Sequence, residues 1–224
     1  MTDMSQRVTI FPIAHIRTDF PEKFGIPRQS NLVPETTGRI IFEVDFRDPL
    51  MLTGIGGFEF LWLLWGFQGT SGWSKTVRPP RLGGKETVGV FASRSPYRPN
   101  PIGLSSVRFL GTEETENGTE LIVSGADLRD HTPIYDIKPY IAYADSRPDA
   151  RSGFASEAPE NRLVVEGCEN LPGELDREAV ISVLRQDPRP AYHDDPDRVY
   201  GLRFGSQDVH FTVCDGVVRI VGES

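Results

Sequence analysis

The chain has 224 residues and a net charge of −8, which suits one large domain or one domain with a small appendage. The acidity argues against indiscriminate nucleic-acid binding, and the two cysteines form neither a metal-binding spacing nor a disulfide framework. The longest apolar run, FEFLWLLWGF at 58–67, has about half the length of a membrane-spanning helix. The first ten residues lack the features of a signal peptide, so we expect a cytoplasmic protein without a membrane anchor.

Short alternating segments dominate the first 140 residues and predict strands. They are rich in β-branched or aromatic residues and are bounded by glycine, proline or asparagine. The expected strands are 8–16, 39–46, 87–92, 104–111 and 120–128. Their spacing is irregular and most neighbours have no helical pattern between them, which disfavours a parallel βαβ fold. A curled antiparallel sheet or barrel is therefore expected over residues 1–145.

The connection 19–38 is too long for a plain turn. It contains three prolines and two aromatic residues, which favour an ordered loop. Ordered loops of this length are usually functional.

The composition changes near 145–160, where ADSRPDARSGFASEAPEN is typical of a linker or an exposed flap. Beyond it, Asp176 is expected to cap a helix over 177–186. A strand at 200–205 and the hairpin DVHFTVC-DG-VVRIV follow, and Asp215-Gly216 suits a type I′ turn. We therefore expect a small α+β domain over residues 146–224.

The charge is unevenly distributed along the chain. Residues 70–110 contain seven basic residues and one acid, a net charge of +6. The basic residues are Lys75, Arg78, Arg81, Lys85, Arg94, Arg98 and Arg108. Such a segment is either an ordinary solvated face or a place where one kind of polyanion binds.

Familiar nucleotide and metal motifs are missing. TGIGGFEF (53–60) does not have the glycine spacing of a dinucleotide fingerprint, and LGGKE (82–86) is not a phosphate-binding loop. The four histidines are scattered singly, so no metal site is expected.

The segment FASRSPYRPNPIGLS (91–105) combines rigidity with directional polar groups. Its three prolines fix the backbone before any ligand arrives, so little ordering entropy is lost on binding. Arg94 and Arg98 offer planar guanidinium groups that suit carboxylate or phosphate, and Tyr97 offers a stacking face. The alternative is a proline-rich crossover whose arginines tie loops together.

Three blocks in this order resemble the TsaA-like family, and within it the TrmO group of tRNA methyltransferases. They are KFGIPRQ (23–29), VFASRSPYRPNPIGLS (90–105) and DHTPIYDIKPY (130–140). DPRPAYH (187–193) is similar to the signature of the C-terminal domain of bacterial members. The resemblance implies a mainly β chain, with a single-sheeted antiparallel β-barrel methyltransferase domain and a small C-terminal α+β domain. It also implies a homodimer that binds S-adenosylmethionine (SAM) near the subunit interface.

The implied reaction is methylation of N6 of threonylcarbamoyladenosine at position 37 of tRNA (t6A to m6t6A). The matching motifs imply eleven cofactor contacts. These are Pro27, Arg28, Gln29, Phe67, Gln68, Arg94, Leu104, Asp130, His131, Thr132 and Pro133.

Two of these positions depart from the family pattern. Members often have His-Gln where this chain has Phe67-Gln68, and Phe67 keeps a flat face but loses a donor. His131 stands where members often have glycine, so its backbone must avoid glycine-only conformations or carry mild strain.

The chemistry of the reactants suggests a role for each group. Arg28 or Arg94 suits the SAM carboxylate, and Asp130 suits its ammonium or ribose hydroxyls. The attacking nitrogen is a weak nucleophile, and Asp136 and Tyr140 are candidates to accept its proton, with Lys138 steadying the carbamoyl or threonyl group. The basic segment is expected to meet the phosphates of the tRNA anticodon arm, with Trp73 or Tyr97 stacking on a base.

Two other functions stay open at this point. One is a SAM-dependent methyltransferase of the same fold that acts on a small molecule or another nucleoside. The other is a SAM-binding sensor or adaptor without catalysis.

Overall fold

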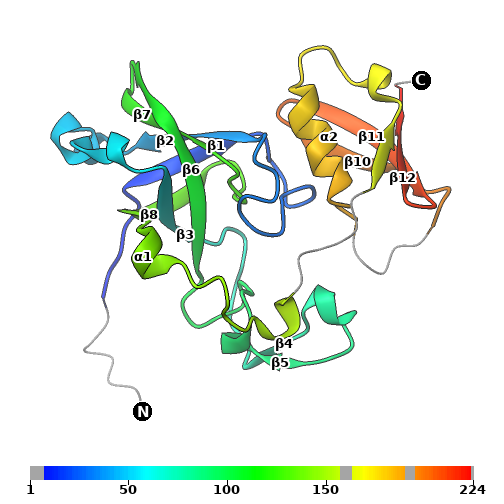
Figure 1. Cartoon of the computed structure of the whole chain (residues 1–224), viewed down its shortest axis with the longest axis horizontal. Helices are drawn as coiled ribbons and strands as arrows, with labels where there is room; N and C mark the ends of the chain where they lie inside the picture. The colour runs from blue at the N-terminus through cyan, green and yellow to red at the C-terminus, as the bar shows by residue number, and fades with distance from the viewer. Residues whose placement is uncertain (1–7, 157–162, 190–194, 223–224) are drawn as a thin grey trace.

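The computed structural model describes residues 8–156, 163–189 and 195–222, and the chain is mainly β, as expected (Figure 1). The strands are β1 Ala14–Thr18, β2 Thr37–Phe42, β3 Phe60–Gly66, β4 Thr76–Val77, β5 Val88–Gly89, β6 Ile102–Thr115, β7 Gly118–Ser124, β8 Thr132–Pro139, β9 Val164–Glu166, β10 Tyr200–Phe204, β11 Gln207–Cys214 and β12 Val217–Val221. The α-helices are α1 Ala142–Asp145 and α2 Arg177–Arg185. No helix among the described residues is long and apolar enough to cross a membrane.

Six strands form one closed antiparallel sheet, in the order β1-β2-β7-β6-β3-β8. The ring closes because β8 pairs with β3 along one side and with β1 along the other. Inward residues of all six strands make a single core, with Ile16, Ile40, Leu63, Val107 and Ile134 completely buried. Alternating burial along β2, in which Gly38, Ile40 and Phe42 are buried, is the period expected of strands with one face on a core.

Three connections meet at one end of this closed sheet. The register places the end of β7 beside the start of β2, through Ser124 and Thr37. It likewise places the end of β3 beside the start of β6, and the start of β8 beside β1. The β1–β2 loop (19–36), the β3–β6 connection (67–101) and the β7–β8 loop (125–131) therefore lie together.

The C-terminal unit, residues 163–189 and 195–222, is a four-stranded sheet in the order β10-β11-β12-β9 packed against α2. The expected helix cap is present, since the Asp176 carboxylate accepts a 3.1 Å hydrogen bond from the Ala179 amide. The expected hairpin is present as well. Asp215 and Gly216 both have positive φ, at 50° and 76°, as a type I′ turn requires.

Several expected strand boundaries are wrong. Residues 8–13 precede β1 without joining it, and Val44–Phe46 form a 3₁₀ turn that ends the strand predicted over 39–46. Only Val88–Gly89 of the segment 87–92 is a strand, and residues 125–128 belong to the β7–β8 loop. The alternating pattern is present in these segments, but among the described residues only isolated backbone hydrogen bonds, such as that from the Ile13 amide to the Ile134 carbonyl, join them to neighbouring strands.

Candidate functional site

Two predicted cofactor residues from distant loops meet directly. Arg94, in the β3–β6 connection, donates a hydrogen bond from Nη1 to Oε1 of Gln29 in the β1–β2 loop. Gln29 is further held by the carbonyl of Arg28, at 2.5 Å from its Nε2. Both side chains are exposed, so the guanidinium of Arg94 keeps donors that a ligand can reach.

A second pair joins the β3–β6 connection to the β7–β8 loop. Gln68 Nε2 donates a hydrogen bond to the carbonyl oxygen of His131. His131 has φ 60°, in the left-handed region that favours glycine, so this non-glycine residue carries the strain expected from the sequence. Its amide donates to Ile16 at 2.8 Å, and its ring stacks on His15 with centroids 5.8 Å apart. These contacts hold the strained turn in place.

Asp130, beside it, is fixed by the end of β1. Its Oδ1 accepts hydrogen bonds from Arg17 Nε at 2.9 Å and from the Thr18 amide at 3.0 Å. Its Oδ2 faces His131 Nε2 at 3.5 Å. The Oδ1 atom of Asp130 is thus occupied by hydrogen bonds from β1, while its Oδ2 atom faces the ring of the neighbouring His131.

A series of contacting aromatic and polar side chains lies beneath these loops. Phe67 packs edge-on against Trp65, with ring centroids 4.4 Å apart. The Trp65 indole donates a 3.0 Å hydrogen bond to Ser105 Oγ, and Ser105 donates a 2.6 Å bond to Asp127 Oδ1. Gly103 makes room for Trp65, because a Cβ there would lie 2.2 Å from the indole ring.

Asp127 lies at this end and has a perturbed pKa, as does Asp19 at the start of the β1–β2 loop, where burial raises the pKa. Burial raises the pKa of the Asp127 carboxyl, while the Ser105 hydroxyl, the positive charge of Arg94 and the Ser30 amide act in the opposite direction. Because Arg94 and Ser30 both act on the pKa of Asp127, the buried Trp65, Ser105 and Asp127 side chains are coupled to the exposed Gln29–Arg94 pair.

The remaining predicted contacts occupy the same end of the closed sheet. Pro27 is buried in the β1–β2 loop next to the exposed Arg28. Leu104 stands on β6 with 53% of its surface exposed. Thr132 closes the β7–β8 turn through a 2.7 Å bond from its hydroxyl to the Arg129 carbonyl, and Pro133 pairs with His15.

The three candidate catalytic residues do not join this cluster within one chain. They follow the outer face of β8, where Asp136 and Lys138 flank the core residue Ile137. The pairing of β8 with β3 shifts its register between Leu64 and Trp65 of β3. This irregularity changes the direction in which the side chains of the second half of β8 point. Along the strand, Asp136 is roughly 13 Å and Tyr140 roughly 25 Å from Thr132.

Their side chains have partners of their own. Lys138 Nζ forms a 2.7 Å ion pair with Asp136 Oδ2, while Asp136 Oδ1 accepts from the Ile137 amide at 2.9 Å. Tyr140 packs against Trp62, with centroids 5.6 Å apart. An aromatic and charged patch therefore covers the outer side of β3 and β8.

The basic segment forms a small hairpin, β4–β5, beside the closed sheet (Figure 1). Arg78, Arg81 and Lys85 are exposed there, and none takes part in the ion pairs of the described residues. Trp73 and Tyr97 are exposed at the base of this hairpin. There the Ser74 amide donates a 3.1 Å hydrogen bond to the Tyr97 carbonyl.

Sequence reasoning missed Asp127, Ser105, Trp65 and Arg17. The signal for Asp127 was an acid between apolar residues in GADL, where the alternation predicted an ordinary strand. Arg17 gave no signal in the sequence, because its partner Asp130 is 113 residues away. Within the described part of the chain, no group of three or more histidine, cysteine or acidic residues is arranged to hold a metal.

Two family models match the chain. One, described as the tRNA-methyltransferase O N-terminal domain, matches residues 15–146, and the other, described as the TrmO C-terminal domain, matches residues 155–222.

Individual proteins are similar over almost the whole length. The tRNA (adenine(37)-N6)-methyltransferase of Escherichia coli is 36% identical over 220 residues, covering 91% of this chain and 92% of that protein. A Pseudomonas aeruginosa protein with the provisional name S-adenosylmethionine-dependent methyltransferase RcsF is 42% identical, covering 91% of both. The crystal structure of TrmO from Pseudomonas aeruginosa aligns with a TM-score of 0.79 at 34% identity, covering 97% of this chain and 98% of that one.

Proposed function

The chain belongs to the tRNA-methyltransferase O family, and on this basis we propose that it methylates N6 of threonylcarbamoyladenosine at position 37 of tRNA, with SAM as the methyl donor. The observation that carries this proposal is the convergence of the predicted cofactor residues. The Gln29–Arg94 and Gln68–His131 pairs bring three loops together at one end of the closed sheet.

The side chains at this end fit the groups that SAM presents. The exposed guanidinium of Arg94 or that of Arg28 suits the carboxylate, and Asp130 Oδ2 suits the ammonium or the ribose hydroxyls. Phe67 is held against Trp65 and offers a flat face to the adenine. When bound, SAM supplies an electrophilic methyl group, and the role of these side chains is to orient it toward the acceptor. We propose that no metal takes part.

The acceptor nitrogen needs a group to accept its proton, since its lone pair is delocalised into the purine and the carbamoyl group. We propose Asp136 or Tyr140 for this role, with Lys138 positioning the carbamoyl or threonyl carboxylate. Asp136 shares the outer face with Leu104, two strands away, but among the described residues its contact partners and those of Lys138 and Tyr140 are not the loop residues Gln29, Arg94 or His131. We infer that these three residues act on the site of a second subunit. We therefore propose a homodimer, with the exposed apolar surface of Leu104 and Phe91 (79% exposed) at the interface.

The β4–β5 hairpin supports a role for the anticodon arm as the substrate. Exposed arginine and lysine side chains attract phosphates, and Trp73 or Tyr97 can stack on an unpaired base. We assign residues 1–145 to a SAM-binding methyltransferase domain, with the closed sheet as its single-sheeted barrel. Residues 146–224 form the small C-terminal domain, and the site of action is the cytoplasm.

The test is methyl transfer from labelled SAM to two matched tRNAs, one with and one without the threonylcarbamoyl group at position 37. We expect transfer only to the modified tRNA, with the added mass on that nucleoside. Transfer to another nucleoside or to a small molecule would favour a different methyltransferase of the same fold. SAM binding without any transfer would favour a sensor.

A further inference from the structure

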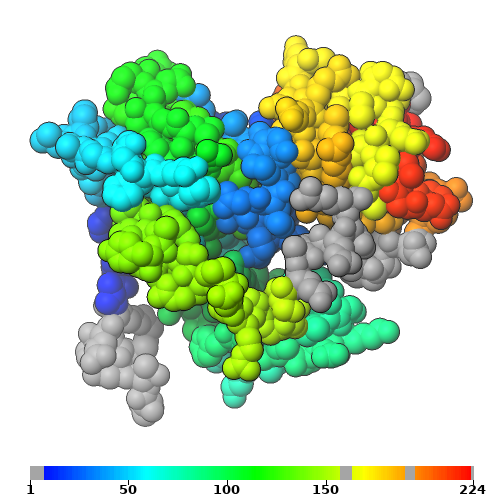
Figure 2. Space-filling model, viewed as in Figure 1, coloured from blue at the N-terminus to red at the C-terminus, as the bar shows by residue number. Residues whose placement is uncertain are grey.

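The β1–β2 loop leaves the core of the closed sheet and packs into the core of the C-terminal unit. Five apolar residues of the loop contact that second core, namely Phe20, Phe24, Ile26, Leu32 and Val33. The strands on either side of the loop contribute Ile16 and Ile40 to the first core. Figure 2 shows the blue segment between the green surface of the closed sheet and the yellow and orange surface of the C-terminal unit.

Aromatic pairs fix the loop on β10 and β11. The Phe20 ring meets Phe204 edge-on at 5.6 Å, and the Phe24 ring stacks on Phe211 at 6.5 Å between centroids. The Gly205 amide donates a 2.8 Å hydrogen bond to the Asp19 carbonyl. These contacts join the first residues of the loop to two strands of the C-terminal unit.

Gly25 lies directly against the same strands. It has φ 92°, and a Cβ at this position would be 2.1 Å from the Leu202 side chain. Leu202 is completely buried on β10, so the loop backbone itself forms part of the wall of the C-terminal core. Only glycine permits this close approach without a shift.

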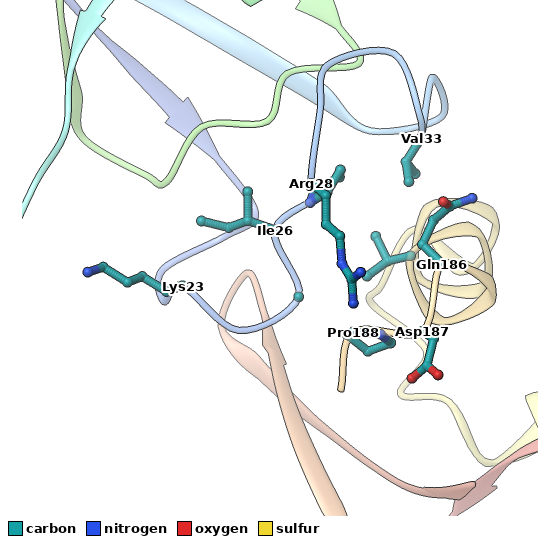
Figure 3. Close-up of a pocket in the computed structure, with 10 residues that line it drawn as sticks. Lys23, Ile26, Arg28, Val33, Gln186, Asp187 and Pro188 are labelled. Carbon is teal, nitrogen blue, oxygen red and sulfur yellow. The ribbon is translucent and has the colours of Figure 1, made fainter. Parts of the chain in front are cut away.

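The tip of this loop carries three predicted cofactor residues, Pro27, Arg28 and Gln29. Arg28 points toward the end of α2, where its Nη2 lies 3.5 Å from the Arg189 carbonyl (Figure 3). A cavity of about 200 Å³ separates the loop from this end of the helix, with Gln186 and Asp187 on its far side. The cofactor residues therefore follow directly on residues 20–26, whose apolar side chains pack on the C-terminal unit.

The closed sheet holds the loop at its two ends. The Asp130 amide donates to the Phe20 carbonyl, and the Asn31 amide donates to the Gly125 carbonyl, both at 2.8 Å. Among the described residues, no backbone-to-backbone hydrogen bond involves residues 22–29. Apart from the hydrogen bond between Gln29 and Arg94, the position of the tip thus depends on side-chain packing against the C-terminal unit.

We propose that the C-terminal unit positions the cofactor loop, with Leu202, Phe204 and Phe211 as positioning residues for SAM binding. This inference rests on the proposed function, because it assumes that residues 27–29 bind SAM. A loop that is correctly placed only part of the time lowers the apparent affinity by that fraction, while saturating SAM restores the turnover. Loss of the support should therefore raise the Kd and KM for SAM and leave kcat and the KM for tRNA unchanged.

The test uses the full chain with two changes on opposite sides of the contact, Phe24→Ala on the loop and Leu202→Ala on β10. The matched control is Val218→Ala, which truncates a buried residue of the same core. Val218 pairs with Val213, beyond the part of β11 that pairs with β10. If Leu202→Ala does not fold, Phe24→Ala decides the question.

Two measurements separate the outcomes. Hydrogen exchange without ligand should be faster at the amides of Asn31, Asp130 and Gly205, whose hydrogen bonds hold the loop, in the two test variants than in the control. Calorimetry should show SAM binding weakened by about tenfold or more in the test variants alone. Unchanged exchange and affinity in Phe24→Ala, with SAM-binding wild type, would overturn this inference and leave the proposed function intact. A wild-type protein that does not bind SAM would overturn the proposed function, while the exchange result would still decide whether the unit supports the loop.

Discussion

Ser105 donates a 2.6 Å hydrogen bond to Asp127, and the same hydroxyl oxygen accepts the indole proton of Trp65. Ser105 as a residue is 2% exposed, so its hydroxyl connects an acid and an aromatic ring away from water. The ring of Trp65 in turn supports Phe67, one of the predicted cofactor contacts.

Replacing Ser105 with alanine should leave a buried indole N–H without an acceptor and remove a donor from Asp127. We expect the free energy of unfolding to fall by about 1–3 kcal/mol, measured by urea denaturation. Ser106→Ala is the matched control, since its hydroxyl makes no hydrogen bond among the described residues and only its carbonyl accepts from Asn31. Equal stability of the two variants would contradict a structural role for the Ser105 hydroxyl.

Asp127 should make stability depend on pH in an unusual direction. Burial raises the pKa of its carboxyl, so ionisation of this group opposes folding. The cost is absent at low pH and grows as the pH rises from the ordinary aspartate range, about pH 4, through the raised pKa. The stability of wild type relative to Asp127→Asn should therefore decline across that window. Urea unfolding at a series of pH values measures the difference, and a constant difference would count against a raised pKa.

Arg94 should contribute more to SAM affinity than to stability, because its hydrogen bond to Gln29 is exposed to solvent. Arg94→Ala removes an exposed guanidinium, and loss of one charge-assisted contact should weaken SAM binding roughly tenfold to a hundredfold in calorimetry. Arg108→Ala removes an equally exposed guanidinium from β6, where it pairs with Glu59 at 2.9 Å. Its SAM affinity should match the wild type. The idea fails if both variants bind SAM alike.

The β4–β5 hairpin should determine the salt dependence of tRNA binding. Changing Arg78, Arg81 and Lys85 together to alanine should lower the slope of log affinity against log salt by about one for each lost phosphate contact. SAM affinity should stay the same. A control that removes the same charge from other exposed positions, Arg147, Arg185 and Arg219 to alanine, should retain the slope. Identical slopes for the two triple variants would remove the hairpin from the tRNA surface.

Catalysis across two subunits can be tested by mixing inactive chains. Asp136→Asn should lower kcat by about 10²–10⁴ if this carboxylate is the base. Arg94→Ala should lower activity at limiting SAM. In an equal mixture of the two chains, sites formed across a two-fold interface should recover about a quarter of the wild-type activity. No recovery in mixed dimers would assign Asp136 to its own subunit or exclude it from the site.

The sequence was informative where local chemistry determines structure. The cap at Asp176, the turn at Asp215-Gly216 and the strain at His131 each depend on residues next to one another. It failed for residues 8–13, where alternation suited a strand but, among the described residues, only Ile13 forms backbone hydrogen bonds with neighbouring segments. It also failed for Asp127, whose burial requires loops from three separate parts of the chain. The family motifs predicted the exposed contacts, while the buried side chains of Trp65, Ser105 and Asp127 beneath them could be identified only from the fold.

A ring of paired strands has no free rim to which a foreign segment can add, and the six-stranded ring here leaves β9 and β10 as the outermost strands of the other sheet. Unwanted growth by strand addition is thereby restricted to that sheet and to the short two-stranded β4–β5 hairpin. Any assembly built on the ring itself must rely on side chains and loops, whose shape and charge are far more selective than exposed main-chain hydrogen-bonding groups.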